Sequence, residues 1–240
     1  LAAGGAAALN QWMERVADAK MVRTRGRPIP AGLVTPEAAL VFGLVLCLSG
    51  DLLLYFGVNW LAALLALVTQ ITYLLAYTPL KKYTPWCTEV GAIPGALPPL
   101  IGWAAAESGI STLGWILFAI LLFWQIPHFM ALAWTFRDDY AKAGFPMGSV
   151  VDPTGGRIAR QAFLFTLLLT TSSLLPTFFG FATIFYTSLA VVLGIWFLFT
   201  ATRFLLAIDR DTAARKLFWA SIAYLPILLG GLVFDRLLLI

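Results

Sequence analysis

Charge is scarce in this sequence. Asp, Glu, Lys and Arg make up 12% of its 240 residues, whereas about a quarter of an ordinary soluble domain is charged. Hydrophobic residues make up 60%. Residues 52–80, 108–136 and 161–202 carry no charge at all, and each run is longer than the roughly 20 apolar residues with which an α-helix crosses a bilayer. This composition excludes an ordinary soluble domain.

Two further features are missing. The apolar runs do not alternate with polar residues, which excludes a transmembrane β-barrel. Only two cysteines occur, Cys47 and Cys87, and they form no recognisable motif, so we predict two free thiols. The remaining class is an all-α, polytopic transmembrane bundle.

The long runs divide into helices at turn-forming residues. We expect a single transmembrane domain, 1–240, of about seven full spans preceded by a partial one. The chain begins with Leu, and its first residues resemble the second half of a helix, so we expect a trimmed chain. The expected helices are a stub ending near Glu14, then 36–56, 59–77, 89–106, 113–135, 158–176, 181–204 and 214–234.

Positive charge is distributed unevenly among the loops. Of the 16 Lys and Arg residues, only Arg236 falls outside one alternating set of loops. The positive-inside rule places the basic set in the cytoplasm. The net charge of +4 follows from this bias and does not indicate nucleic acid.

The first basic segment also carries acids at regular spacing. Asn10, Glu14 and Asp18 lie at i, i+4 and i+8, which is one face of a helix. Their oxygen atoms suit Mg²⁺, which bridges carboxylates to phosphates. Basic residues that suit a diphosphate follow at once; they are Lys20, Arg23, Arg25 and Arg27. A membrane anchor with incidental acids is the alternative interpretation.

Two other loops of the same set combine charges with tyrosine. Tyr77 and Lys81 lie four residues apart, and the segment 137–140 holds Arg137, Asp138, Asp139 and Tyr140. Each cluster alone would suit a solvated loop. Together the three clusters favour a binding site for a polyanion at one membrane face.

Two apolar stretches are unusual. Pro94, Pro98 and Pro99 fall inside one expected span, where they break or kink the helix, either beside a cavity or simply for packing. The stretch "WQIPHF" holds His128, the only histidine, inside another span. Ionisable residues at membrane depth usually face the interior and act there. A buried histidine with a purely structural partner remains the alternative.

Four segments together resemble a known family. They are "NQWMERVADAKMVRTRGRP", "YTPLKKYTPWCTEVGAIPGALPPLIGW", "WQIPHF" and "DDYAKAGFPM". In this order and spacing they are similar to protohaem farnesyltransferases (haem O synthases), a branch of the UbiA-type membrane prenyltransferases. The segments cover about residues 9–147, and the helices beyond are similar in kind only.

The resemblance implies a nine-helix fold, of which this chain would lack the first helix and part of the second. It implies farnesyl diphosphate as donor, protohaem as acceptor and Mg²⁺ as cofactor, in a bacterial inner membrane with the active site on the cytoplasmic side. It also suggests haem A synthase or an oxidase assembly factor as a partner.

The family motifs correspond to particular residues here. The first acidic motif corresponds to Asn10, Glu14 and Asp18, the Tyr-x-x-x-Lys motif to Tyr77 and Lys81, and the second charged loop to Asp139 and Tyr140. We therefore expect Asn10, Glu14, Asp18 and Asp139 to bind metal. We expect the diphosphate to be bound by Lys20, Arg23, Arg27, Lys81 and Arg137, and haem by His128. The first motif departs from many members, which carry Asp at position 14 and a further acid at position 16.

The implied reaction begins when the allylic C–O bond of farnesyl diphosphate breaks. A vinyl group of protohaem attacks the resulting cation, and water then adds. Two alternatives remain open from the sequence: a prenyltransferase with a quinone-precursor or chlorophyll-like acceptor, and a transporter of anionic lipids. A transport path would favour polarity at mid-membrane depth, whereas here polarity concentrates at one face.

Overall fold

The computed structural model describes residues 1–238 and contains only helices within that range. The helices form two compact units. Unit 1 comprises Leu1–Ser111 and Phe136–Val151, and unit 2 comprises Thr112–Thr135 and Asp152–Ile240. The units are interleaved along the chain, because a helix of unit 2 separates the two segments of unit 1.

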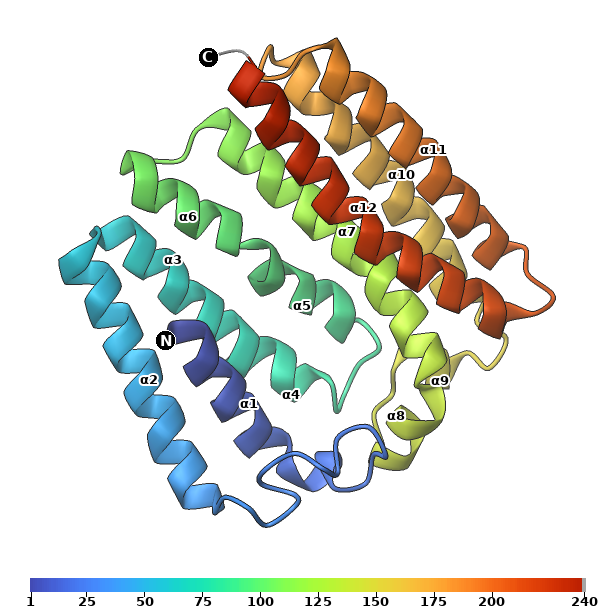
Figure 1. Ribbon diagram of the computed structural model, residues 1–240. Helices are drawn as coiled ribbons and strands as arrows, with labels where there is room; N and C mark the ends of the chain where they lie inside the picture. Colours follow the sequence, from blue (N-terminus) through green and yellow to red (C-terminus); the bar gives the residue numbers. More distant parts are fainter. Residues whose placement is uncertain (239–240) are drawn as a thin grey trace. The chain divides into compact units, whose positions relative to one another are not determined.

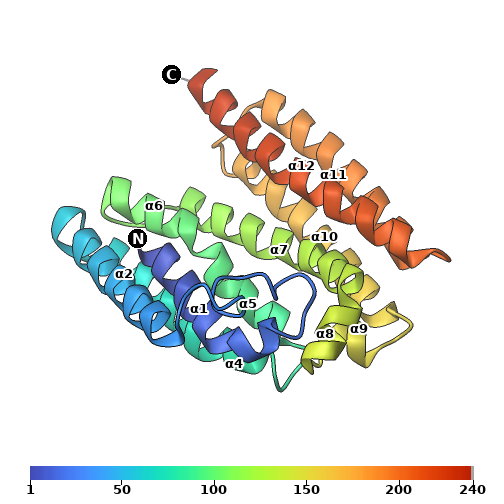
Figure 2. The same ribbon diagram turned by 60° about the horizontal axis from the view of Figure 1, so that its bottom comes forward.

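Unit 1 contains several helices whose axes run side by side (Figure 1). In chain order the elements are α1 (Ala2–Asp18), α2 (Pro36–Gly57), α3 (Trp60–Ile71), the π-helix η1 (Thr72–Tyr77), α4 (Thr78–Leu80), α5 (Cys87–Ala96), α6 (Pro98–Glu107), α8 (Arg137–Ala143) and α9 (Gly148–Val151). Figure 2 brings forward the end of this unit at which α1 and α4 end and α8 lies.

Side-chain caps define where the long helices of unit 1 begin. The Thr35 hydroxyl accepts a hydrogen bond from the backbone N–H of Ala38, and Pro36 occupies the first turn of α2. The Asn59 side chain accepts from the N–H of Ala62 at the start of α3. Such caps satisfy backbone donors that a helix leaves unpaired at its N-terminus.

Small residues let α1 pack directly against α2. A Cβ atom added at Gly5 would lie 2.6 Å from the backbone nitrogen of Cys47, and one added at Gly43 would lie 2.7 Å from Leu9. In a membrane this close approach replaces the hydrophobic driving force with van der Waals contact. The stub that the sequence predicts is therefore a well-packed helix, and it extends one turn past Glu14, to Asp18.

The proline-rich span is divided into two ten-residue helices, α5 and α6, which meet at Leu97. Pro98 has no N–H to continue the ladder of α5, and its fixed φ suits the first turn of a new helix. The prolines predicted a break or kink in this span. The span expected as one helix, 89–106, is in fact two helices, because a new helix begins at Pro98.

Unit 2 consists of α7 (Thr112–Thr135), α10 (Gly156–Phe178), α11 (Ile184–Leu205) and α12 (Arg210–Leu238). Asp235, fully buried on α12, caps the start of α11: its carboxylate accepts from the Thr183 N–H at 2.7 Å, from the Thr183 hydroxyl and from the Tyr186 N–H at 3.3 Å. A negative charge beside unpaired N–H groups stabilises a helix N-terminus.

At the other end of unit 2, Arg210 joins the starts of α10 and α12 to the end of α7. Its guanidinium donates to the Gly155 carbonyl at 2.7 Å and lies 5.8 Å from the Trp134 ring centroid. Gly155 has φ +67°, and a Cβ atom there would lie 2.5 Å from the Trp134 ring. Glycine is thus required at this position both for its backbone conformation and for its contact.

Six helices within residues 1–238 are long and apolar enough to span a membrane: Pro36–Gly57, Trp60–Leu80, Thr112–Thr135, Gly156–Phe178, Ile184–Leu205 and Arg210–Leu237. Within unit 1, α1 packs against α2 and α6 packs against α3. The predicted all-α, polytopic membrane architecture is confirmed, and the chain is an integral membrane protein.

Candidate active site

Three polar side chains of α1 face the interior of unit 1. Asn10, Glu14 and Asp18 are 5%, 4% and 0% exposed, as their spacing of one helical turn predicts. Val16 lies on the opposite face and is 67% exposed. A buried amide and two buried carboxylates at a helix end are costly to hold unless each has a partner or a ligand.

Lys81 is the partner of Glu14. Its ammonium nitrogen lies 2.9 Å from Glu14 Oε1 and donates a hydrogen bond to Oε2 at 3.1 Å. The same nitrogen lies 4.5 Å from the Tyr77 ring centroid. Burial acts to lower the pKa of Lys81, but Tyr77 and the Glu14 carboxylate act to raise it and outweigh burial, so the net shift of this pKa is upward. Lys81 is therefore a firmly held cation.

The Tyr77 side chain is positioned by α5. A Cβ atom added at Gly91 would lie 2.5 Å from the Tyr77 ring, so the ring rests directly on the Gly91 backbone. The turn that carries Tyr77 is the π-helix η1, and Pro79, which has no N–H, follows it closely. A π-helical turn of this kind is rare and often occurs at functional sites.

Asn10 connects α1 to the same turn. Its Nδ2 donates to the Thr78 hydroxyl at 3.0 Å, and that hydroxyl donates to the Tyr73 carbonyl at 2.8 Å. Thr78 is 2% exposed. The chain of hydrogen bonds fixes the register between the acidic face of α1 and the helix end that bears Lys81.

Asp18 is bound on one side only. Arg27 donates to its Oδ2 at 2.8 Å, while Oδ1 is buried and has no hydrogen-bond partner among the described residues. The Thr24 hydroxyl donates to the Asp18 carbonyl at 3.0 Å and folds the basic loop back over the end of α1. Since an unpartnered carboxylate oxygen is unfavourable in the interior, Oδ1 is a position where a cation would be stabilised.

The second charged loop contacts the first. The backbone N–H of Arg23 donates to Asp139 Oδ2 at 3.1 Å. The Arg23 guanidinium lies over two rings of that loop, 5.2 Å from the Phe136 centroid and 6.0 Å from that of Tyr140. Cation–π contacts of this kind hold the basic loop against α8.

The structure therefore brings most of the predicted residues of unit 1 together in one charged cluster. Lys20 is exposed beyond it, and the Asp139 carboxylate contacts the Arg23 loop and lies 4.0 Å from the Lys142 ammonium. Within residues 1–238 no group of three or more His, Cys, Asp and Glu side chains is arranged to hold a metal ion. Any ion here would thus take few protein ligands. The catalytic, metal-binding and diphosphate-binding roles of all these residues, Asp139, Lys20 and Arg137 among them, stay predictions.

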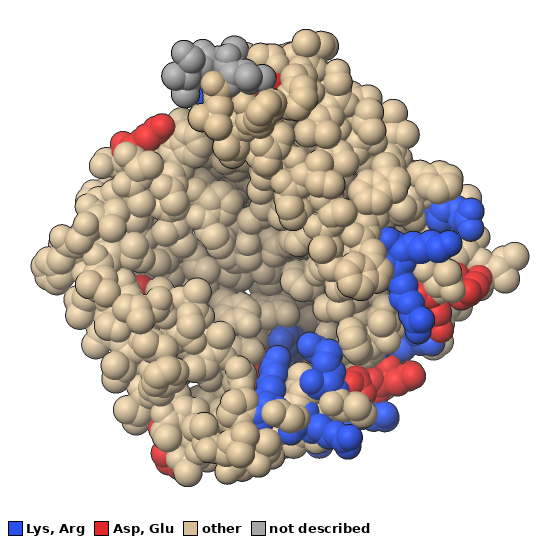
Figure 3. Space-filling model, viewed as in Figure 1, with Lys and Arg blue, Asp and Glu red and all other residues tan. Residues whose placement is uncertain are grey.

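The charge distribution agrees with the position of this cluster. In unit 1 the Lys and Arg side chains gather where α1 and α4 end, with acidic side chains nearby, while most of the surface over α2 and α3 is uncharged (Figure 3). An anion approaching unit 1 would meet its positive charges at this end.

His128 belongs to unit 2. It lies on α7, and its Nδ1 is 2.8 Å from the Ser221 hydroxyl of α12. The imidazole stacks with the rings of Trp124 and Phe218, at centroid distances of 5.0 and 4.9 Å. The histidine was predicted from the sequence, whereas Ser221, 93 residues away and without a motif around it, was not.

Three contributors to these sites were missed from the sequence: Thr78, Gly91 and Ser221. Thr78 and Gly91 lie inside the quoted family-like segment, so a search for small or hydroxyl residues near Tyr77 and Lys81 would have found them. Ser221 offered no local signal.

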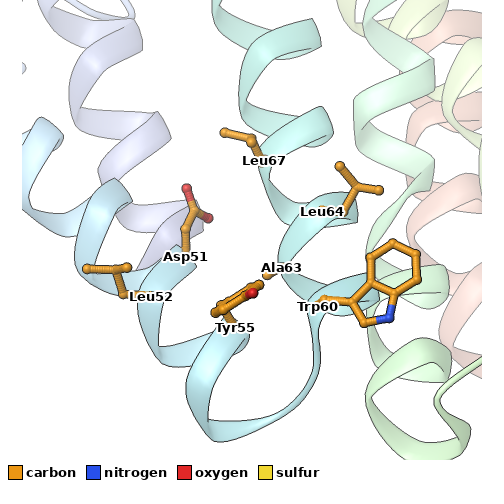
Figure 4. A pocket seen from close by; sticks show the side chains of 7 residues that line it. All are labelled: Asp51, Leu52, Tyr55, Trp60, Ala63, Leu64 and Leu67. Atoms are coloured by element: carbon orange, nitrogen blue, oxygen red, sulfur yellow. The ribbon is translucent and has the colours of Figure 1, made fainter.

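A separate cavity of about 360 Å³ lies between the end of α2 and the start of α3, away from the end of α3 that leads into η1 and Tyr77. Asp51 is the only charged residue among those that line it. Its carboxylate points between the two helices (Figure 4) and accepts from Gln70 Nε2 at 2.7 Å. With a single acid that is already paired, this cavity has no charges to bind a diphosphate.

Comparison with known proteins extends over the whole chain. Residues 1–222 match the UbiA prenyltransferase family. The chain is 53% identical over 239 residues to a protoheme IX farnesyltransferase of Opitutus terrae, covering 100% of this chain and 81% of that protein. It is 46% identical to a protoheme IX farnesyltransferase of Solibacter usitatus, covering 98% and 80%.

Two solved structures share the fold. A digeranylgeranylglyceryl phosphate synthase structure superposes with a TM-score of 0.79 at 19% identity, covering 98% of this chain and 81% of that one. The apo structure of a UbiA homologue from Aeropyrum pernix K1 superposes with a TM-score of 0.69 at 18% identity, covering 96% and 84%.

Proposed function

This chain belongs to the UbiA prenyltransferase family, and we propose that it transfers the farnesyl group of farnesyl diphosphate to a vinyl group of protohaem, giving haem O. It is a membrane prenyltransferase. The observation that carries the proposal is the buried cluster of Glu14, Asp18 and Lys81 at the polar end of unit 1, in a chain that matches protohaem farnesyltransferases over its whole length.

The cluster suits the departure of diphosphate. Lys81 and Arg27 are cations held in place by carboxylates, so they need little rearrangement as negative charge develops on the leaving oxygen. Fixed charges in a site with little water stabilise such a transition state strongly. Arg23, Lys20 and Arg137 would add positive charge around the phosphates. The Tyr77 ring would support the Lys81 ammonium through their contact. Asn10 would keep the turn before Lys81 in place through its hydrogen bond to Thr78.

Enzymes of this family generally depend on a divalent metal ion, and the residues present suit Mg²⁺. Asp18 Oδ1 is buried without a partner, and Glu14 lies one turn away on the same face. Mg²⁺ commonly uses one or two carboxylates and completes its shell with water and substrate phosphate, which agrees with so small a protein ligand set. When bound, the ion would neutralise charge on the diphosphate. Asp139 is a further candidate ligand, because its carboxylate contacts the basic loop that follows α1.

The acceptor would react as a nucleophile. The C–O bond to diphosphate breaks first, and a vinyl carbon of protohaem then forms a C–C bond to C1 of the allylic cation. Water adds to the cation that this leaves on the haem side chain and loses a proton. The apolar helices keep water away from the allylic cation until the C–C bond has formed. His128 is the residue we assign to protohaem.

We propose a bacterial inner membrane, with the charged cluster on the cytoplasmic side, because the positive-inside rule predicts that the loops rich in Lys and Arg face the cytoplasm. Farnesyl diphosphate and protohaem are then the substrates and the bilayer is the surrounding phase. Haem A synthase or an oxidase assembly factor is the partner that the product suggests.

The test is a transfer assay. The 240-residue chain, purified in detergent, is incubated with labelled farnesyl diphosphate and protohaem, with Mg²⁺ or with a chelator. We expect label in a hydroxyethylfarnesyl porphyrin only when the metal is present. Label in a quinone precursor or a chlorophyll-like acceptor, and none in protohaem, would contradict the assignment.

A further inference from the structure

The hydroxyl of Ser221 determines which nitrogen of His128 carries the proton. Ser221 is 0% exposed on α12, and its Oγ lies 2.5 Å from the Phe218 carbonyl oxygen of the preceding turn. Two acceptor oxygens this close require a proton between them, so the single hydroxyl hydrogen of Ser221 is donated to Phe218. Ser221 Oγ can then only accept from its other neighbour.

That neighbour is His128 Nδ1, 2.8 Å away. Since Ser221 has no second hydrogen, Nδ1 must carry the proton and donate it to Oγ. A neutral imidazole has one N–H, so the other ring nitrogen, Nε2, is left with an unshared lone pair. The Trp124 indole N–H donates to the Ser221 carbonyl at 2.8 Å and fixes α7 and α12 in this register.

Three aromatic rings surround the imidazole. Trp124 and Phe218 stack with it at interplanar angles of 21° and 29°, and Phe129 packs against it in a T-shaped arrangement at a centroid distance of 5.3 Å. The Nε2 lone pair lies in the plane of the imidazole, so an iron ion would bind it along that plane and not from a stacked position. His128 is only half-buried, and within residues 1–238 its Nε2 has no hydrogen-bond partner.

We infer that Ser221 is a positioning residue that holds His128 as the Nδ1–H tautomer, so that Nε2 binds the iron of protohaem as an axial ligand. This inference rests on the proposed function and selects between two modes of haem recognition. A neutral Nδ1–H imidazole offers no Nε2–H to a propionate carboxylate, whereas it offers an unshared electron pair to iron. Imidazole with its second nitrogen hydrogen-bonded is a usual arrangement for ligation.

The first arm of the test needs no haem. Because His128 is the only histidine, protein labelled with ¹⁵N-histidine and purified through a tag without histidine gives the NMR signals of one imidazole. We expect a protonated Nδ1 and an unprotonated Nε2. A protonated Nε2 beside a bare Nδ1 would overturn the inference, even if the chain proves to be a haem farnesyltransferase.

The second arm uses ferric protohaem titrated into wild type, Ser221→Ala and Ser221→Thr. Loss of a hydrogen bond behind a metal-ligating histidine typically weakens affinity by about 10-fold to 100-fold. We expect Ser221→Ala to show that loss of affinity, a changed haem absorption band and a mixture of tautomers. Ser221→Thr keeps the hydroxyl, so it should have the haem affinity, absorption band and single tautomer of the wild type.

An unchanged haem spectrum and affinity in folded Ser221→Ala would refute the positioning role. Should Ser221→Ala not fold, Ser221→Thr and the wild-type NMR signals still decide the matter. Tautomer and haem affinity behaving as expected, in a chain that transfers no farnesyl group to protohaem, would contradict the proposed function and leave this inference standing.

Discussion

Lys81 Nζ lies 2.9 Å from Glu14 Oε1, although 67 residues separate the two in sequence. The side chains are 14% and 5% exposed, so the ion pair is largely removed from water. Taking one partner away leaves the other charge buried and unpaired, which is costly. The pair is therefore both a structural tie between α1 and α4 and a source of fixed positive charge.

Lys81→Met should lower the transfer rate by about 100-fold or more, as the loss of a preorganised charge does in other enzymes. It should also lower the stability of unit 1 by about 3 kcal/mol, because Glu14 loses its counter-ion. Transfer assays and thermal unfolding would measure both. Lys82→Met is the matched control, since Lys82 is exposed. Equal effects of the two substitutions would contradict a special role for Lys81.

The direction in which the pKa of Lys81 is shifted determines how this ion pair responds to pH. The pKa of Lys81 is raised above the ordinary lysine value, so its contribution to stability is complete below that ordinary value, about 10.4. It is lost only as the pH rises above it. Thermal stability measured from pH 7 to pH 9 should therefore show no step that Lys81→Met abolishes. A step in that range that vanishes in Lys81→Met would be inconsistent with the raised pKa.

Glu14→Gln and Asp18→Asn remove charge while keeping the volume of each side chain. We expect either change to reduce metal-dependent turnover by about 100-fold or more, with normal membrane insertion and little change in haem affinity. Val16→Asp, on the exposed face of the same helix, should leave activity roughly unchanged or improve it. Near-normal turnover in both Glu14→Gln and Asp18→Asn would show that these acids serve only as an anchor.

Gly91→Ala tests the seat of the Tyr77 ring. The added methyl group would lie 2.5 Å from the ring, so ring or helix must shift, at a cost of about 1–3 kcal/mol. We expect lower thermal stability together with slower transfer, since Tyr77 supports Lys81. Gly102→Ala in the next helix meets no atom within 4 Å and should be neutral or stabilising. The prediction fails if Gly91→Ala behaves like this control.

The topology is testable by labelling. In a background lacking Cys47 and Cys87, single cysteines at Arg25, Lys82 and Lys142 should all react with an impermeant thiol reagent from the cytoplasmic side. A cysteine at Arg215, near the start of α12, should do the same, and one at Gly57 should react only from the opposite side. Lys82 and Lys142 labelled from opposite faces would disprove the predicted arrangement of spans.

Periodicity in the sequence was enough to predict the acidic face of α1. The spacing of Asn10, Glu14 and Asp18 depends only on the pitch of a helix, and all three are buried together. The break in the proline-rich span was equally local, although its division into two helices at Leu97 depends on how α6 restarts.

Long-range contacts could not be predicted in the same way. Nothing near Lys81 identifies Glu14 as its partner, and nothing near His128 identifies Ser221, because such pairs depend on how helices dock. Asp235 is a further case. It caps the start of another helix, α11, and no local pattern in the sequence identifies that helix as its partner.

The interleaving of the two units has a consequence for biosynthesis. Unit 1 is completed only by Phe136–Val151, which follows α7 in the chain. A ribosome delivers these residues after the first helix of unit 2 has already emerged. The hydrogen bond between Arg23 and Asp139 is therefore a late event in assembly, and until it forms the basic loop of the nascent chain has no contact with Asp139. A fragment ending at Ser111 would contain Glu14, Asp18 and Lys81 and yet could never close that loop by itself.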